Sequence, residues 1–231
     1  MSVIEIAADE VHLWDANLAV DNEEIERNES FLSRGELLYA MRFTDLRAKN
    51  QFIVSRAKLR ELLGGYAGQS PRELQFGMTR EGKPFLASAK EFEFNLTHSG
   101  DIVLYGVAHS RHVGVDVEKI KEIPRAIELA KRFMSAEEHD KIVSAPAETR
   151  DRDFLSLWVR REGSGKAYGV GVWKVLENGG RVPGPNPLFA EITRDYLCRI
   201  IDYADGEYVA AVAALGDGWR LVKKGTVLAH R

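Results

Sequence analysis

Cysteine is nearly absent from this chain. Cys198 is the single cysteine among 231 residues, so no disulfide can form within the chain. Structural disulfides belong to oxidising compartments, and a chain without them suits a reducing one. The first ten residues, MSVIEIAADE, have neither the basic region nor the apolar stretch of a secretory signal. No apolar run is long enough to cross a bilayer. We therefore expect a soluble, cytoplasmic protein without a membrane partner.

An excess of basic residues is also lacking. The chain has 32 Lys and Arg against 35 Asp and Glu, a formal net charge of −3. Non-specific binding to nucleic acid depends on a positive excess, so we expect no nucleic-acid partner. Hydrophobic residues make up 45% of the chain, which is enough for a sizeable core in one large or two small domains.

The hydrophobic periodicity predicts an α+β protein, with strands and helices both spread along the chain. A helix over residues 47–66 is expected to close at Gly64 and Gly65. Ser135 and Glu138 have the spacing of a capping box at the start of a further helix. The other expected elements are a strand at 11–18, helical structure at 22–41, a strand, a turn at Gly82 and a short strand over 70–86, three β runs in 92–118, helices in 124–142 and 151–169, a loop at 179–187 and hairpins in 195–225.

The two halves of the chain resemble each other weakly. SGDIVLYGVAHS at 99–110 and DGEYVAAVAALG at 205–216 both place a turn before an apolar strand. Each half also has one long helix before its hairpins. We therefore expect two similar lobes, 1–112 and 113–231, in a pseudo-two-fold arrangement, each a small antiparallel sheet packed with a long helix. A site between the lobes would begin at Asp116, just after the crossing.

The segment VGVDVEK, residues 113–119, sets two carboxylates side by side. Its three valines form the apolar side of a strand, and Asp116 and Glu118 then share the other face. Two negative charges this close repel, and something must offset the repulsion. The pair is explained equally well by a strand face that is exposed to water and by a bound cation. Magnesium is the cation that takes one or two carboxylates together with water and substrate phosphate.

A second segment with chemistry is LWVRREGSGKAYGVGVW, residues 157–173. Glu162 and Lys166 are four apart and would share one helix face. Alone, this is more simply a surface ion pair, worth about 0.3–0.5 kcal/mol. Gly163 and Gly165 each cost a helix about 1 kcal/mol relative to alanine, so we expect them to leave room for a ligand.

The GSGK in that segment is not a phosphate-binding P-loop. The P-loop pattern needs a further glycine upstream, where this chain has arginine, and a Ser or Thr directly after Lys166, which is absent. This argues against an alternative reading, a magnesium-dependent phosphoanhydride enzyme acting on a nucleotide.

Three further stretches carry weaker signals. In NLTHSG, residues 95–100, hydroxyl residues flank His98 where a strand becomes a turn, which suits an anion site. A single histidine is nevertheless more often structural than catalytic. Lys83 lies in the turn REGKP, and Arg47 lies near the start of the first long helix, where most charges form a solvated face.

Four motifs in order resemble the surfactin-type 4′-phosphopantetheinyl transferases. They are GKP at 82–84, FNLTHSG at 94–100, GVDVE at 114–118 and WVRREGSGKAYGVG at 158–171. The resemblance implies two similar α+β lobes in one chain. It also implies transfer of the phosphopantetheine arm of coenzyme A to a serine of an apo acyl or peptidyl carrier protein, with magnesium, releasing adenosine 3′,5′-bisphosphate. The length matches the single-chain type, and we expect a monomer.

The resemblance also implies residue roles. Glu162 would be the general base, and Lys166 and His98 would act on the phosphates. The implied magnesium ligands are Asp116, Glu118 and Glu162, and the implied coenzyme A contacts are Arg47, Lys83, Asn95, Thr97, His98, Asp116 and Lys166. The alternative is a non-catalytic carrier-binding module of the same fold, whose mark would be a missing carboxylate.

This chain departs from the family pattern in two places. Arg161 precedes Glu162 where the family usually has lysine, and an arginine presents a planar fork in place of a point charge. Gly163, Ser164 and Gly165 replace larger residues. The departures bear on helix rigidity and carrier docking more than on the chemistry.

Overall fold

Two long helices and two main sheets dominate the computed structural model, which describes residues 3–169, 196–203 and 205–227. The predicted loop at 179–187 lies outside the described residues. The elements are β1 Glu10–Asn17, α1 Asn22–Glu29, α2 Arg34–Ala40, α3 Leu46–Ala67, the 3₁₀ helix η1 Pro71–Glu73, β2 Phe76–Met78, β3 Pro84–Leu86, β4 Phe92–Ser99, β5 Ile102–His109, β6 Val113–Lys119, α4 Ala126–Phe133, α5 Ala136–Ser144, α6 Ala147–Tyr168, β7 Tyr196–Tyr203, β8 Tyr208–Leu215 and β9 Arg220–Thr226.

The strands form two main sheets and a separate hairpin. The first sheet has the order β4-β5-β1-β9, the second has the order β6-β8-β7, and β2 pairs with β3. The pairs β1/β5, β4/β5, β6/β8 and β7/β8 are antiparallel. The predicted α+β class is therefore confirmed. None of the described helices is both long enough and apolar enough to span a bilayer.

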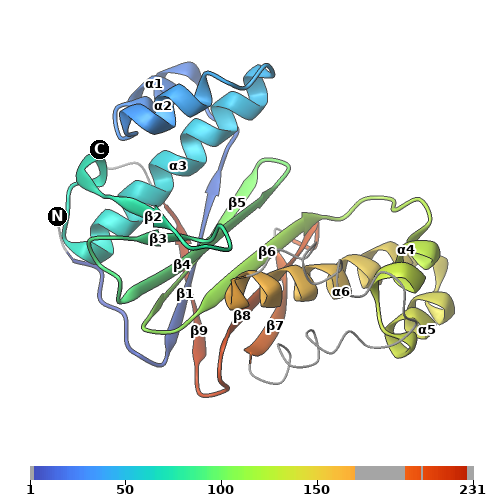
Figure 1. Ribbon diagram of the computed structural model, residues 1–231. Helices are drawn as coiled ribbons and strands as arrows, with labels where there is room; N and C mark the ends of the chain where they lie inside the picture. The colour runs from blue at the N-terminus through green and yellow to red at the C-terminus, as the bar shows by residue number, and fades with distance from the viewer. Residues whose placement is uncertain (1–2, 170–195, 204, 228–231) are drawn as a thin grey trace.

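The core is layered, because alternate residues of each strand point to opposite faces. Helix α3 covers one face of the first sheet, the two sheets pack against each other through their inner faces, and α6 covers the far face of the second sheet (Figure 1). In β5, Val103 and Tyr105 pack toward α3 whereas Leu104 packs toward the second sheet. In β6 the three valines belong to the layer between the sheets, as the sequence predicts. Asp116 therefore lies on the α6 side of the second sheet.

Helix α3 ends later than the sequence suggests. The prediction that Gly64 and Gly65 close it is wrong, because the helix continues to Ala67 and ends at Gly68, which has a left-handed φ of 62°. The two earlier glycines permit close packing instead. A Cβ on Gly65 would lie 2.7 Å from Ile4 Cδ1, and the Gly65 carbonyl accepts a hydrogen bond from Ile4 N at 2.9 Å.

The C-terminal strand crosses between the predicted lobes. Strands β7 and β8 form a predicted hairpin, but β9 does not continue it. It runs parallel to β1 instead, with Val11 opposite Leu221, and completes the first sheet. The predicted boundary at 112–113 falls between β5 and β6, and the division into two domains stays a prediction with β9 as an exception.

Helix α6 lies very close to strand β6, and glycine makes this approach possible. A Cβ on Gly114 would lie 2.2 Å from the Gly163 carbonyl oxygen and 2.3 Å from Ala167 N. A Cβ on Gly163 would lie at an ordinary 3.5 Å from Ala211 Cβ, on the sheet side of the helix. The expectation that Gly163 opens space for a ligand is therefore wrong, because the sheet fills that side. For Gly165, which is buried, it stays a prediction.

Two alanine substitutions test this packing. We expect Gly114→Ala to lower the melting temperature by about 5 °C or more, because overpacking against fixed backbone costs about 1–3 kcal/mol and often more. Gly163→Ala should leave it unchanged or raise it by a few degrees, since alanine favours a helix by about 1 kcal/mol over glycine. Thermal unfolding followed by circular dichroism measures both. A stable Gly114→Ala protein would show that helix and strand do not depend on this contact.

Candidate active site

Strands β4 and β6 meet through polar side chains where the two sheets come together. Asn95, Thr97 and Ser99 occupy alternate positions of β4, so they share a face. That face is turned toward β6, and Asn95 Oδ1 accepts a hydrogen bond from Val115 N at 2.9 Å. We call these three residues, together with Asp116 and Glu118 of β6, the polar seam.

Asp116 is the most buried carboxylate of the polar seam, with 5% of its surface exposed. Its Oδ1 accepts hydrogen bonds from Lys166 Nζ at 2.6 Å and from Thr97 Oγ1 at 3.0 Å. Lys166 Nζ also lies 3.3 Å from Thr97 Oγ1. Asp116 Oδ2 is buried and has no hydrogen-bond partner among the described residues. Burial raises the pKa of Asp116, and the Lys166 ammonium opposes the rise. One carboxylate oxygen is thus committed and the other is left for a ligand.

A serine of β4, a strand of the first sheet, binds the Glu118 carboxylate. Ser99 Oγ donates to Glu118 Oε2 at 3.0 Å and accepts from Lys119 N at the same distance. Burial raises the pKa of Glu118, the Ser99 hydrogen bond lowers it, and the charge of Asp116 raises it further. The sequence reasoning missed this role of Ser99. The signal was present, since residues 97 and 99 repeat on β4 the same-face spacing of 116 and 118 on β6.

Glu162 approaches the polar seam from α6, one turn before Lys166. Burial raises the pKa of Glu162 to about 7, Lys166 lowers it, and the charges of Asp116 and Glu118 raise it. The three carboxylates are therefore electrostatically coupled. Among residues 3–169, 196–203 and 205–227, however, no three acidic, histidine or cysteine side chains converge closely enough to form a ready metal cluster. The Lys166 ammonium is the cation in contact with Asp116.

The raised pKa of Glu162 predicts a pH dependence of stability. Between pH 4.5 and 7 the folded chain holds a proton that the unfolded chain has lost, so stability falls as pH rises and is lowest above pH 7. Glu162→Gln removes this penalty. After allowance for its partial exposure, we expect the variant to gain about 1–2 kcal/mol over wild type at pH 8 and almost nothing at pH 4.5. Chemical denaturation without metal or coenzyme A measures the gap, and a gap that is equal at both pH values would contradict the assignment.

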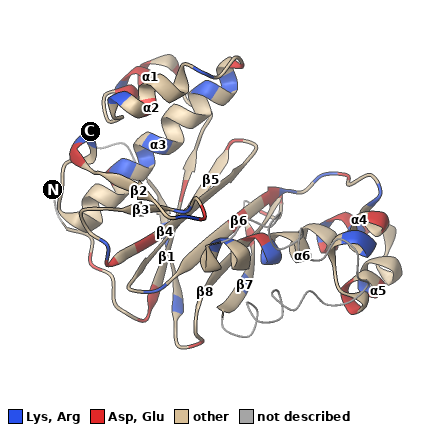
Figure 2. Ribbon diagram, in the orientation of Figure 1, with Lys and Arg blue, Asp and Glu red and all other residues tan. Residues whose placement is uncertain are grey.

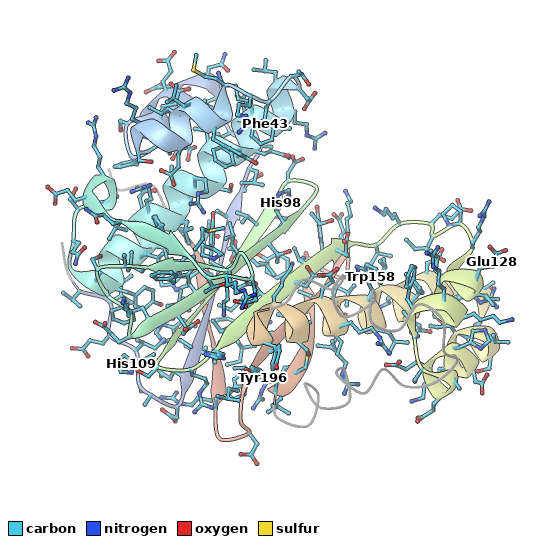
Figure 3. All side chains as sticks on the ribbon, viewed as in Figure 1. Phe43, His98, His109, Glu128, Trp158 and Tyr196 are labelled. Atoms are coloured by element: carbon cyan, nitrogen blue, oxygen red, sulfur yellow. The ribbon has the colours of Figure 1, made fainter. Side chains whose placement is uncertain are left out.

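The remaining predicted site residues flank the polar seam. His98 lies near the end of β4 (Figure 3), where loss of solvent around its ring and the charge of Lys166 lower its pKa. Lys83 Nζ donates to Glu93 Oε2 at 3.1 Å and to the Val113 carbonyl at 3.3 Å. The structure therefore ties Lys83 to β4 and to the start of β6.

Arg47 lies beyond the C-terminal end of β4, whereas Lys83 contacts the start of that strand. Its guanidinium forms an exposed ion pair with Asp101 at 2.8 Å, in the turn between β4 and β5. Gln51 Nε2 reaches the same turn and donates to the Gly100 carbonyl at 2.9 Å. Basic residues thus flank the polar seam, and Figure 2 shows acidic residues near the end of β6 and on the facing part of α6 beside basic ones.

Comparisons with known proteins show the family of this chain. The family model described as the 4′-phosphopantetheinyl transferase superfamily matches residues 112–213, and the model described as 4′-phosphopantetheinyl transferase, N-terminal, matches residues 19–110. The 4′-phosphopantetheinyl transferase HetI of a Nostoc species is 31% identical over 221 residues, which cover 94% of this chain and 92% of that protein. The chain belongs to the 4′-phosphopantetheinyl transferase family.

Other relatives in this family match a shorter part of the chain. The 4′-phosphopantetheinyl transferase psf-1 of Bacillus pumilus is 33% identical over 150 residues, 65% of this chain and 63% of that protein. The 4′-phosphopantetheinyl transferase Sfp of Bacillus subtilis is 27% identical over 159 residues, 69% of this chain and 70% of that protein. The resemblance seen in the sequence motifs is therefore confirmed. Both halves of the polar seam lie within the matched residues, β4 within those of the N-terminal model and β6 within those of the superfamily model.

Proposed function

We propose that this protein transfers the 4′-phosphopantetheine group of coenzyme A to a serine of an apo acyl or peptidyl carrier protein. The observation that carries the proposal is the contact of Lys166 with Asp116 and Thr97, which joins α6 to both strands of the polar seam in a member of this family. It places the Lys166 ammonium against Asp116, one turn of α6 from the proposed base Glu162. These groups suit the transfer of a phosphoryl group that carries several negative charges.

The reaction exchanges one phosphorus–oxygen bond for another. The carrier serine oxygen bonds to the phosphorus that bears pantetheine, and the bond from that phosphorus to the bridging oxygen of the pyrophosphate breaks. Adenosine 3′,5′-bisphosphate leaves with the electron pair. The serine proton goes to the Glu162 carboxylate, directly or through one water. Because burial raises the pKa of Glu162, this carboxylate accepts a proton more readily than a solvated glutamate.

Lys166 serves the phosphates in this scheme. Its ammonium is 2.6 Å from Asp116 Oδ1, and its charge lowers the pKa of His98. Phosphate oxygens arriving beside the polar seam would accept hydrogen bonds from Lys166, and from His98 at its edge. A fixed cation here stabilises the negative charge that builds up on the leaving phosphate.

We include magnesium in the proposal because the polar seam offers carboxylate oxygens to it, although the three carboxylates do not form a ready metal cluster among the described residues. Asp116 Oδ2 is a buried carboxylate oxygen without a partner among the described residues, and the pKa values of Glu118 and Glu162 are raised by burial. Hard divalent cations bind such oxygens. Asp116, Glu118 and Glu162 would hold the ion. When bound, it would neutralise charge on the pyrophosphate and on the departing bisphosphate.

Coenzyme A would extend along β4. Arg47 forms an ion pair with Asp101, and Lys83 forms one with Glu93. On binding coenzyme A, a phosphate would replace the carboxylate as the partner of each basic side chain. Thr97 would contact the ligand from the polar seam. Asn95 would do so with the part of its amide that Val115 N does not use.

We further propose that the two lobes, 1–112 and 113–231, are related by a pseudo-two-fold axis with the site between them. The two 22-residue helices, α3 and α6, support this, since each covers the outer face of one sheet. We also propose that the protein is a cytoplasmic monomer that acts on coenzyme A and a carrier protein.

The test is a product assay that separates an enzyme from a carrier-binding module. The protein is incubated with coenzyme A, magnesium and a panel of apo carrier proteins, and nucleotides are separated by chromatography. We expect adenosine 3′,5′-bisphosphate to appear only when an apo carrier is present. Carrier binding by calorimetry with coenzyme A left intact would instead show a non-catalytic module.

A further inference from the structure

Arg161, the residue that departs from the family pattern, is buried beside the proposed base. Only 6% of its surface is exposed. It directly precedes Glu162 on α6, and its guanidinium donates to Glu138 Oε2 on α5. The two side chains are 7% and 14% exposed. One terminal nitrogen of the guanidinium therefore pairs with a carboxylate of the neighbouring helix.

Glu138 is itself fixed by the start of α5. It is the N3 residue of the capping box predicted from the sequence, and its Oε2 accepts from Ser135 N at 2.9 Å while Glu138 N donates to Ser135 Oγ at 3.2 Å. Burial would raise the pKa of Glu138, but Arg161 and Ser135 together hold it below its usual range. An ionised, oriented carboxylate thus faces Arg161.

An apolar cavity of about 270 Å³ lies between α4 and the same helix α6 that carries Arg161. Leu129 and Phe133 line it from α4, Leu155 and Trp158 line it from α6, and Glu118 of the polar seam borders it. Figure 3 shows Trp158 on α6 and Glu128 on α4, away from the helices of the first lobe. Helix α5 follows α4 directly and packs against it, so a tie between α5 and α6 also restrains α4 beside the cavity.

We propose that Arg161 and Glu138 form a positioning clamp that fixes α4 and α5 against the turn of α6 carrying Glu162. The proposal deepens the proposed function, because it makes Arg161 a positioning residue and not a phosphate ligand. An arginine suits a clamp better than a lysine, since its planar fork holds one orientation against a carboxylate. Loosening the clamp would displace Glu162 and the cavity wall together, and small displacements of a reacting group slow catalysis strongly.

The first test is a double-mutant cycle on stability, which does not depend on any activity. The variants are Glu138→Gln, which keeps a capping-box side chain at this position, Arg161→Met, and the double variant. Each single variant should lower the melting temperature by about 5 °C or more, because each removes one charge from a buried ion pair. The double variant should fall no more than about 2 °C below the worse single variant.

A matched control lies one residue earlier on the same helix. Glu137 forms an exposed ion pair with Lys141 at 2.8 Å, with side chains 81% and 63% exposed. Glu137→Gln should shift the melting temperature by less than about 2 °C. The clamp would be overturned if the double variant lost the sum of the two single decreases in melting temperature. It would also be overturned if Glu138→Gln lowered the melting temperature as little as Glu137→Gln does. If Arg161→Met does not fold, Arg161→Lys takes its place in the cycle, with a smaller loss expected.

The second test separates a clamp from a phosphate ligand. Adenosine 3′,5′-bisphosphate is the probe, with its affinity measured by calorimetry. A clamp predicts an affinity within about twofold of wild type for both single variants, and kcat for transfer lowered by about tenfold in both. It also predicts that Arg161→Lys recovers part of kcat. A tenfold loss of bisphosphate affinity in Arg161→Met alone would make Arg161 a phosphate ligand and overturn the proposal. If wild type shows no transfer, the proposed function fails, while the stability cycle still decides the clamp.

Discussion

Replacing Glu162 with glutamine should lower kcat for phosphopantetheine transfer by about 10²–10⁴-fold, the usual range for loss of a general base. Glutamine keeps the shape of the side chain but cannot accept the serine proton. The carboxylate is half-buried, its pKa is raised to about 7, and it lies one turn from Lys166. The KM for coenzyme A should change by less than about tenfold, because Lys166 and the β4 side chains remain.

The measurement is steady-state transfer to an apo carrier at saturating magnesium. Glu148→Gln is a matched control, since Glu148 lies exposed in the first turn of the same helix. Its kcat should equal that of wild type. A near-normal kcat in Glu162→Gln would move the base to another group.

Removing divalent metal should abolish transfer, and restoring it should return the activity. The three coupled carboxylates need a cation when the pyrophosphate adds more negative charge, and Lys166 alone offsets only one charge. Asp116→Asn should raise the magnesium concentration for half-maximal rate by about tenfold or more, because the amide has no negative charge and keeps only one oxygen that could bind the ion. Titration of magnesium into EDTA-treated protein measures both effects.

The control for this variant is Asp140→Asn, at a side chain that is 80% exposed on α5. It should leave the magnesium titration unchanged. Binding of manganese to the protein without coenzyme A gives a readout independent of turnover, and Asp116→Asn should weaken it. Full transfer in EDTA would remove the metal from the proposed function.

Local patterns predicted most of the elements and some of the site. Alternation placed the valines of β6 toward the inner layer and Asp116 with Glu118 on the opposite face, and side-chain spacing identified the capping box of Ser135 and Glu138. These features depend on residues a few positions apart, which the sequence displays directly. The glycine pair at 64–65 gave a wrong helix end, because a glycine that ends a helix and one that permits close packing look alike in sequence.

Contacts between distant residues could not be predicted in this way. Strand β9 pairs with β1 across more than two hundred positions, and Lys166 meets Asp116 across 50. The ion pair of Arg161 with Glu138 joins two helices whose packing depends on the whole second core. The hydrogen bond of Ser99 to Glu118 depends on β4 and β6 lying side by side, which follows from sheet packing and not from either segment.

The most direct test of the central claim is the intact mass of an apo carrier protein after incubation with this protein, coenzyme A and magnesium. We predict a gain of one phosphopantetheine group, located on the carrier serine by fragmentation and absent from a carrier with that serine replaced by alanine. Wild-type protein should give this gain, and Glu162→Gln should give it far more slowly. A panel of apo carriers that all keep their original mass with wild-type protein would contradict the account.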